Sequence, residues 1–281
     1  MRVTKHEHAA LTIRDSGKTL IVDPGSFTDP LPDDGDVVAI VLTHEHPDHW
    51  TPEHLRRILS NAPKAQIIGP QGLADAAAGF DVTVVSPGDS MKVGPFELEF
   101  VAVNHSIPDA LAVAIRTHAG TVLATGDFKM DQLPLDGRLT DLRAFSRLGE
   151  AGVDLFLVDS TNADVPGFTP LEKEIGPVLD QVIGKAPRRV IVASFSSHVH
   201  RVQQVMDAAA AHGRRLALLG RSMVRNMTIA EDLGYLNVPD GLLIDYKKAR
   251  NLPDDQIVYM STGSQGEPMA VLSRMANLDH E

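Results

Sequence analysis

The sequence predicts an α/β protein in two parts, a strand-rich segment over residues 1–159 and a parallel α/β segment over residues 160–281. Short apolar stretches separated by turn residues fill the first part, which indicates strands joined by tight turns. In the second part, apolar strands alternate with longer stretches of helical periodicity, which is typical of βαβ units. A chain of 281 residues is long enough to bury a core in each part.

The elements of the first part follow from turn and capping residues. Asp15-Ser16-Gly17 predicts one hairpin, and His118-Ala119-Gly120 predicts another. Residues 36–43 read as a buried strand, and Thr51 with Pro52 then predicts the cap and first turn of a helix. Further elements are expected in the order strand, helix, strand and strand, over residues 65–69, 70–79, 81–86 and 96–105.

The second part predicts a sheet whose strands are separated by helices. Apolar strands are expected over residues 154–160, 188–195, 214–220 and 256–263. Helices are expected over residues 170–184, 198–212 and 221–233. Glycine and hydroxyl residues follow several of these strands, and loops of that kind present backbone N–H groups to anions.

The composition is that of a globular protein without disulfides. Hydrophobic residues make up 43% of the chain, charged residues 22%, and there is no cysteine. The sequence predicts no membrane span and no signal peptide, and we expect a cytoplasmic protein. A net charge of −11 argues against nucleic-acid binding by bulk charge. However, residues 188–225 hold seven arginines and one acid, so this island is either a solvated surface or a local phosphate-binding patch.

The strongest functional signal is the stretch THEHPDH over residues 43–49, directly after the predicted buried strand. Side chains two residues apart point the same way on an extended backbone, and the following turn can bring the Asp-His pair back toward them. Two further candidates, His105 and Asp127, also follow predicted strands, where open sheets place their sites. Metal binding is therefore favoured over a structural role for His44, His46, Asp48 and His49.

Other chemistry-bearing residues are interpreted as structural. His6 and His8 also form an H-x-H pair, but no Asp-His follows, so both are predicted to be strand residues. Trp50 is expected to pack beside the metal loop. The methionines near residues 223–227 have helical spacing and are expected in the core.

The stretch THEHPDH resembles the signature of the metallo-β-lactamase fold, an αββα sandwich that holds one or two metal ions, usually zinc. The resemblance implies a first ion bound by His44, His46 and His105, with manganese or magnesium as alternatives to zinc. It implies a second ion bound by Asp48, also a catalytic residue, and by His49. Asp127 would bridge the two ions, and Asp23 would orient a ligand from behind. Water activated by the metal would be the nucleophile.

Residues 104–281 resemble ribonuclease J, in which a β-CASP domain interrupts the metallo-β-lactamase fold and the substrate is RNA. The resemblance lies in blocks such as NHSIPDALAVAIRTHAGTVLATGDFKMDQLPLDG, LFLVDSTNADVPGFT, IVASFSSHVHRVQQV, GRSMVRNM and STGSQGEPM. It implies that Asp159 is the first β-CASP motif acid and that His200 is a catalytic histidine. The candidate phosphate and RNA contacts are Ser197, His198, His200, Arg201, Arg221, Ser222, Ser261, Gly263 and Ser264.

The chain also departs from the ribonuclease J pattern. Residues 1–103 are more similar to small lactonase-like hydrolases, which suggests a join of two relatives near residue 104. Ribonuclease J carries a later H-x-S-G-H stretch, and residues 1–281 contain none, so the sandwich is expected to be incomplete and truncated. We therefore expect the second metal site to bind more weakly than the first, and we do not expect His280 to replace the missing histidine ligand. We also expect a homo-oligomer in which exposed apolar surface is covered.

Three functions follow from these observations. The first is a zinc-dependent ribonuclease of the ribonuclease J type, with RNA as the partner and weak activity. The second is a hydrolase of small esters or lactones, suggested by residues 1–103. The third is a protein that binds metal or RNA without catalysis. Whether cleavage is endonucleolytic or exonucleolytic is left open.

Overall fold

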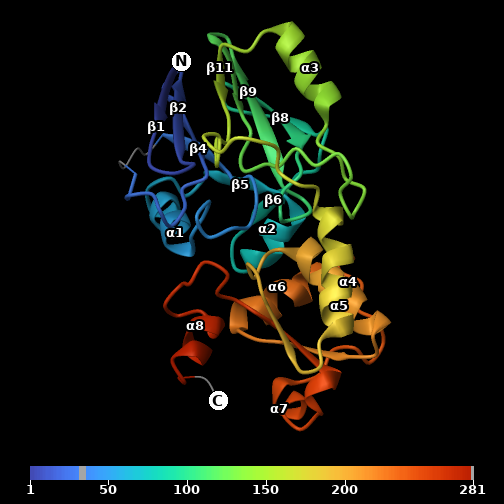
Figure 1. Ribbon diagram of the computed structural model, residues 1–281. Coiled ribbons are helices and arrows are strands. Elements are labelled where there is room, and N and C mark those ends of the chain that lie inside the picture. The colour runs from blue at the N-terminus through green and yellow to red at the C-terminus, as the bar shows by residue number, and fades with distance from the viewer. Residues whose placement is uncertain (32–35, 280–281) are drawn as a thin grey trace. The chain divides into compact units, whose positions relative to one another are not determined.

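The structure is a computed structural model that describes residues 1–31 and 36–279 (Figure 1). Its main chain forms two compact units that interleave along the sequence. The first contains Met1–His105, Asp109–Met130 and Arg138–Gly167, and the second contains Ser106–Pro108, Asp131–Gly137 and Phe168–Glu281. The boundary predicted after residue 159 stays a prediction, and each unit is described by itself.

The first unit opens with a sheet in the order β1-β2-β3-β4-β5-β6. Its strands are Arg2–Lys5, Leu11–Asp15, Lys18–Val22, Val37–Val41, Gln66–Gly69 and Val82–Val84. Neighbours are antiparallel from β1 to β3 and parallel from β3 to β6. The first predicted hairpin joins β2 to β3. Ser16 and Gly17 have φ values of 50° and 70°, the left-handed conformation that two-residue hairpin turns need.

A second sheet in the first unit has the order β11-β10-β9-β8-β7. Its strands are Leu155–Leu157, Gly120–Ala124, Leu111–Thr117, Phe96–Ala102 and Ser90–Val93. The predicted hairpin between β9 and β10 is confirmed by their antiparallel register. β11 pairs in parallel with β10, so the apolar stretch at residues 154–160 belongs to this sheet and not with the later strands.

Helices cover both outer faces of the paired sheets. The core between the sheets includes Leu20, Val41 and Phe100. Helices α1 (Pro52–Asn61) and α2 (Gln71–Ala76) pack on the first sheet, and α3 (Leu142–Ala151) packs on the second. Figure 1 shows α1 beside β4 and β5, and α3 beside β8 and β9. This order of layers confirms the predicted αββα sandwich.

The second unit is a parallel α/β layer. Its sheet has the order β12-β14-β13, formed by Val190–Ala193, Ile257–Ser261 and Arg215–Leu218. The helices are α4 (Ile175–Lys185), α5 (Val199–Ala211), α6 (Arg221–Asp232), α7 (Tyr246–Ala249) and α8 (Val271–Ala276), with short 3-10 turns at Glu172–Glu174 and Asp254–Gln256. The three predicted helices are confirmed as α4, α5 and α6. Across residues 1–31 and 36–279, no helix has the length and apolar character needed to cross a membrane.

Candidate metal centre

The predicted metal ligands of the first unit follow the carboxyl ends of strands. The stretch at residues 43–49 follows β4, His105 follows β8 and Asp127 follows β10. A main-chain hydrogen bond of 3.0 Å from Leu111 N to Thr43 O joins the two sheets at this edge. The strand ends therefore bring side chains from distant parts of the sequence together.

The first donor group consists of His44, His46, His105 and Asp127, whose ligating atoms lie within 4.8 Å of one another. His44 Nε2 lies 2.9 Å from His46 Nδ1, and His105 Nε2 lies 3.1 Å from the same atom. Nitrogens that bind one tetrahedral ion at about 2.0–2.1 Å lie about 3.3 Å apart. The three imidazoles therefore fit a single zinc-sized ion.

A hydrogen-bond chain sets the tautomer of His44. Thr43 Oγ1 donates to Asp23 Oδ2 over 2.7 Å, so it accepts from His44 Nδ1 over 3.0 Å. The lone pair of His44 is thus left on Nε2, the atom that faces His46. Burial, followed by the charges of the neighbouring histidines, lowers the pKa of His44 well below its usual range. The ring is therefore the neutral ligand that a metal needs.

A second donor group consists of His8, Asp48 and His49, whose ligating atoms also lie within 4.8 Å of one another. His8 Nε2 lies 2.9 Å from Asp48 Oδ2, and His49 Nε2 lies 3.9 Å from the same oxygen. The prediction that His6 and His8 are strand residues is wrong. Both lie in the loop between β1 and β2, which closes because His6 N donates to Ala10 O over 2.9 Å.

Asp127 lies between the two donor groups. Its Oδ1 is 3.2 Å from His49 Nε2, and its Oδ2 is 3.9 Å from His105 Nε2. Burial raises the pKa of Asp127, but its contact with His49 and the charges of His49 and His105 outweigh burial and lower this pKa to about 2. An ionised carboxylate with one oxygen toward each group can bridge two cations.

Asp23 orients His49 through a hydrogen bond to its Nδ1 atom. It is 1% exposed and has a φ of 47°, a left-handed conformation that is unusual for aspartate. Its Oδ2 accepts from His49 Nδ1 over 2.9 Å, which leaves Nε2 as the ring nitrogen that faces the donor group. Burial lowers the pKa of His49, but the charges of Asp23 and Asp127 outweigh it and raise this pKa to about 10. A bound cation would displace that proton.

Glu45 separates the two motif histidines and points away from them. A Cβ added at Gly72 would lie 3.0 Å from Asp109 Oδ2 and 3.3 Å from Glu45 Oε2, so the two acids share the space beside α2. Burial, followed by the charge of Asp109, raises the pKa of Glu45 to about 8. Burial also raises the pKa of Asp109. Glu45 therefore retains its proton at neutral pH.

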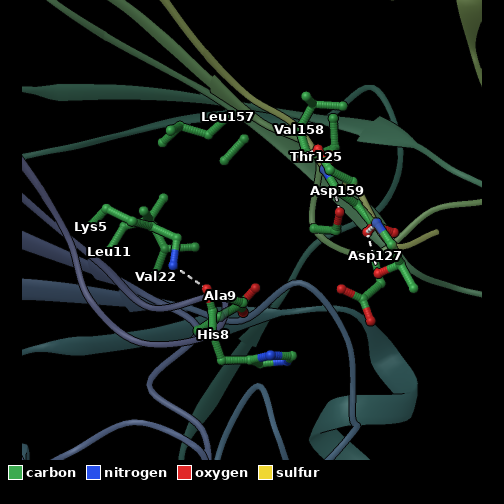
Figure 2. A pocket seen from close by; sticks show the side chains of 15 residues that line it. Lys5, His8, Ala9, Leu11, Val22, Thr125, Asp127, Leu157, Val158 and Asp159 are labelled. Carbon is green, nitrogen blue, oxygen red and sulfur yellow. Dashed lines mark hydrogen bonds between the residues drawn. The ribbon is translucent and has the colours of Figure 1, made fainter. Parts of the chain in front are cut away.

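A cavity of about 280 Å³ opens beside the donor groups. Figure 2 shows one wall with Lys5, His8, Ala9, Leu11 and Val22, and the other with Thr125, Asp127, Leu157, Val158 and Asp159. Asp159 is held in place, because its Oδ2 accepts from Phe128 N over 3.2 Å and its Oδ1 from Thr161 N over 2.9 Å. Asp159 thereby fixes the loop that carries Asp127.

The predicted phosphate loops of the second unit follow β12, β13 and β14. Since these strands are parallel, their carboxyl ends lie at one edge of the sheet. Arg221 and Ser222 begin α6 with exposed side chains, and Ser264 is exposed in the loop after β14. These residues are available to a ligand, whereas Ser261 is completely buried and Gly263 packs against Leu272.

Other predicted RNA contacts are engaged inside the second unit. Arg201 donates to Glu172 over 2.7 Å and 3.1 Å, and His198 Nε2 lies 3.6 Å from Glu172 Oε2. Ser197 is half-buried in the turn before α5, and His200 Nε2 lies 3.2 Å from Asp136 Oδ2. The arginine island is also largely structural: Arg188 and Arg189 pair with Asp254, Arg214 donates to main-chain carbonyls, and Arg215 donates to the Gly241 carbonyl.

Comparison with known proteins first defines the class. Residues 2–122 match a beta-lactamase superfamily domain. A solved structure of a protein of unknown function from Enterococcus faecalis has the same fold, with a TM-score of 0.64, 14% identity, and coverage of 96% of this chain and 80% of that one. The superfamily implies metal dependence, and the two donor groups agree with it.

Residues 187–281 match the ribonuclease J beta-CASP domain. The chain is 50% identical over 253 residues to ribonuclease J of Mycobacterium tuberculosis, covering 87% of this chain and 45% of that protein. It is 43% identical over 260 residues to ribonuclease J of Thermus thermophilus, with the same two coverages. The chain thus combines a beta-lactamase superfamily domain with a ribonuclease J beta-CASP domain, and it spans about half the length of these relatives.

These matches correct the predicted join near residue 104. A similarity that covers 87% of the chain is longer than residues 104–281 alone, so it extends into the first 103 residues. The stretch at residue 104 is therefore no boundary of similarity to ribonuclease J. His280, which the sequence excludes as a substitute ligand, lies outside the described residues.

Proposed function

We propose that this chain hydrolyses RNA phosphodiester bonds with divalent cations held at the two donor groups. The observation that carries the proposal is Asp127, which directs one oxygen toward each group. The relatives are ribonucleases J, and similarity to them extends over 87% of the chain.

His44, His46 and His105 would hold the first cation, Asp48 and His49 the second, and Asp127 would be shared. We propose zinc, because a nitrogen-rich set without thiolates suits it. Bound cations would supply water that loses its proton near neutral pH and would offset negative charge on the phosphate.

The remaining residues would position the ligands and the substrate. Thr43 and Asp23 accept the Nδ1 hydrogens of His44 and His49, so that their Nε2 atoms face the cations, and Asp159 holds the Asp127 loop. We propose that Asp48 orients the attacking water beside the second cation. The loops after β12, β13 and β14 are the proposed RNA contacts of the second unit, and His200, which lies 3.2 Å from Asp136 Oδ2, stays a predicted catalytic histidine.

Hydrolysis of a small ester is a second candidate, and the cavity favours it. Leu11, Val22, Leu157 and Val158 give the cavity of about 280 Å³ an apolar lining beside Asp127. A pocket of this size with a partly apolar lining accepts a small acyl or aryl group. The same pocket also fits the apolar face of a nucleobase, so the substrate class needs a direct test.

The test compares labelled 5′-monophosphorylated RNA with an aryl ester, using protein loaded with zinc or manganese. We expect RNA cleavage that is lost in Asp127→Ala and kept in Asp81→Asn, which changes an exposed aspartate directly before β6. Ester cleavage alone would favour the second candidate. Cleavage of neither substrate would favour a binding protein without catalysis.

Two further properties are proposed with this function. The absence of cysteine and the RNA substrate agree with a cytoplasmic location. A homo-oligomer stays a prediction, supported by Phe156, which is 52% exposed on the edge strand β11. Light scattering that finds only monomers would contradict it.

A further inference from the structure

We propose that His8 is a direct ligand of the second cation, so that the loop between β1 and β2 completes the Asp48–His49 group. This inference rests on the proposed metal centre. His8 lies outside the THEHPDH stretch. With His8 included, the second cation would have two imidazole and two carboxylate ligands, of which Asp127 is shared with the first cation.

The geometry directs His8 into the group. Its Nε2 lies 2.9 Å from Asp48 Oδ2, and its ring meets the His49 ring edge-on at a centroid distance of 5.2 Å. Phe27 contacts the same imidazole, edge-on at 5.4 Å. In Figure 2 the His8 ring points toward the side of the cavity where Asp127 lies.

The loop holds His8 in an unusual backbone conformation. Its φ of 52° lies in the left-handed region, which a non-glycine residue rarely adopts. Ala10 N donates to Glu7 O over 3.2 Å, and Thr28 Oγ1 donates to Glu7 O over 3.3 Å. Lys5 Nζ donates to the carbonyls of His6 and His8. These contacts fix the chain on both sides of His8 and present its side chain to Asp48.

A simple ion pair between His8 and Asp48 would explain only part of this arrangement. His49 is completely buried, and among the described residues its Nε2 has no hydrogen-bond partner. That nitrogen is 3.2 Å from Asp127 Oδ1 without the alignment of a hydrogen bond. A cation bound by His8, Asp48, His49 and Asp127 would satisfy this buried nitrogen, whereas the ion pair does not.

A cysteine substitution tests direct ligation, because the chain contains no cysteine of its own. His8→Cys in the full chain is titrated with cobalt under a reductant that does not bind metal. We expect a near-ultraviolet thiolate-to-cobalt charge-transfer band that appears with the second equivalent. Glu7→Cys places a thiol in the same loop on an exposed residue and should give no band.

Affinity measurements on His8→Ala complete the test. We expect the second zinc ion to bind at least about tenfold more weakly, since even loss of an outer partner of a ligand costs about 10–100-fold. The first ion should bind as in the unsubstituted protein. Glu7→Gln is the control for charge and loop folding, and thermal melts without metal check that both variants fold.

Each outcome decides the inference. A band in His8→Cys together with weaker second-site binding in His8→Ala supports it. A missing band overturns direct ligation, even if His8→Ala binds the second ion weakly. Unchanged binding in His8→Ala also overturns it, because the band would then come from a ligand that the thiol creates. Failure of RNA cleavage alone would reject the proposed function and leave the metal result standing.

Discussion

The two donor groups of the first unit differ in the elements that carry them. His44, His46, His105 and Asp127 all follow strands of the paired sheets. The second group combines the loop residue His8 with Asp48 and His49 from the turn after β4. Each group contains one completely buried histidine, His44 or His49, and the side chains of His8 and Asp48 are 32% and 27% exposed.

One edge of the paired sheets can therefore carry a rigid and an adaptable metal site side by side. Ligands on strand ends are positioned by the sheet before a cation binds, whereas loop ligands must be held by local contacts. We therefore expect the first ion to bind more tightly than the second, in agreement with the sequence-based prediction. Equal affinities in a metal titration would contradict this comparison.

The largest effect is expected from Asp127→Asn, which removes the charge that both groups share. Both ions should bind more weakly. Loss of an outer partner of a ligand can lower metal affinity about 100-fold, and we expect the affinity for the second ion to fall by more than that. Chelator competition with zinc measures both constants. Asp81→Asn is the control, and selective loss of one ion would show that Asp127 serves only one group.

A Gly25→Ala substitution should disturb the second group through its backbone. A Cβ at Gly25 would lie 1.7 Å from the Asp48 carbonyl oxygen and 2.4 Å from His49 N, so the turn must move. Overpacking of this kind costs about 1–3 kcal/mol of the free energy of unfolding. We expect weaker binding of the second ion and nearly unchanged binding of the first. Gly149→Ala in α3, with open space around its Cβ, is the control.

Asp23→Asn should weaken the second ion more than the first, because Asp23 contacts His49 directly and His44 only through Thr43. The expected loss is about 10–100-fold for the second ion. Competition titrations measure it, with Thr43→Ser as a variant that keeps the hydroxyl. Equal losses at both ions would mean that Asp23 supports the whole edge and not His49 in particular.

The smallest effect on metal affinity is expected from Glu45→Gln, which changes the buried acid between His44 and His46 and leaves all four donors of the first group in place. The pKa of Glu45 in the folded chain is about 8, above its usual value of 4.5. Its stabilising contribution is therefore complete below pH 4.5 and is lost as the pH rises toward about 8. Urea unfolding of metal-free protein should show a flatter pH dependence in the variant.

The control for Glu45→Gln is Glu53→Gln, which changes an exposed residue in the first turn of α1. That variant should retain the pH dependence of the unsubstituted chain. Identical pH profiles for Glu45→Gln and the unsubstituted chain would show that the acid pair does not link protonation to folding.

Local sequence signals predicted most of the fold. The turn at Asp15-Ser16-Gly17 specifies its hairpin because these residues tolerate left-handed backbone. Thr51 caps α1 as expected, with its Oγ1 accepting from His54 N over 3.1 Å. The partner of the strand at Leu155–Leu157 was not predictable, since its apolar pattern suits either sheet and only tertiary packing selects β10.

The sequence by itself determined the donor types and the strand ends that carry them, because H-x-H spacing and strand periodicity are local properties. Tertiary structure alone decided that His8 joins Asp48 and His49, since a loop from the start of the chain reaches them through space. It also decided that most of the arginine island is occupied by internal partners. A residue's neighbours across the fold are not encoded in its spacing along the chain.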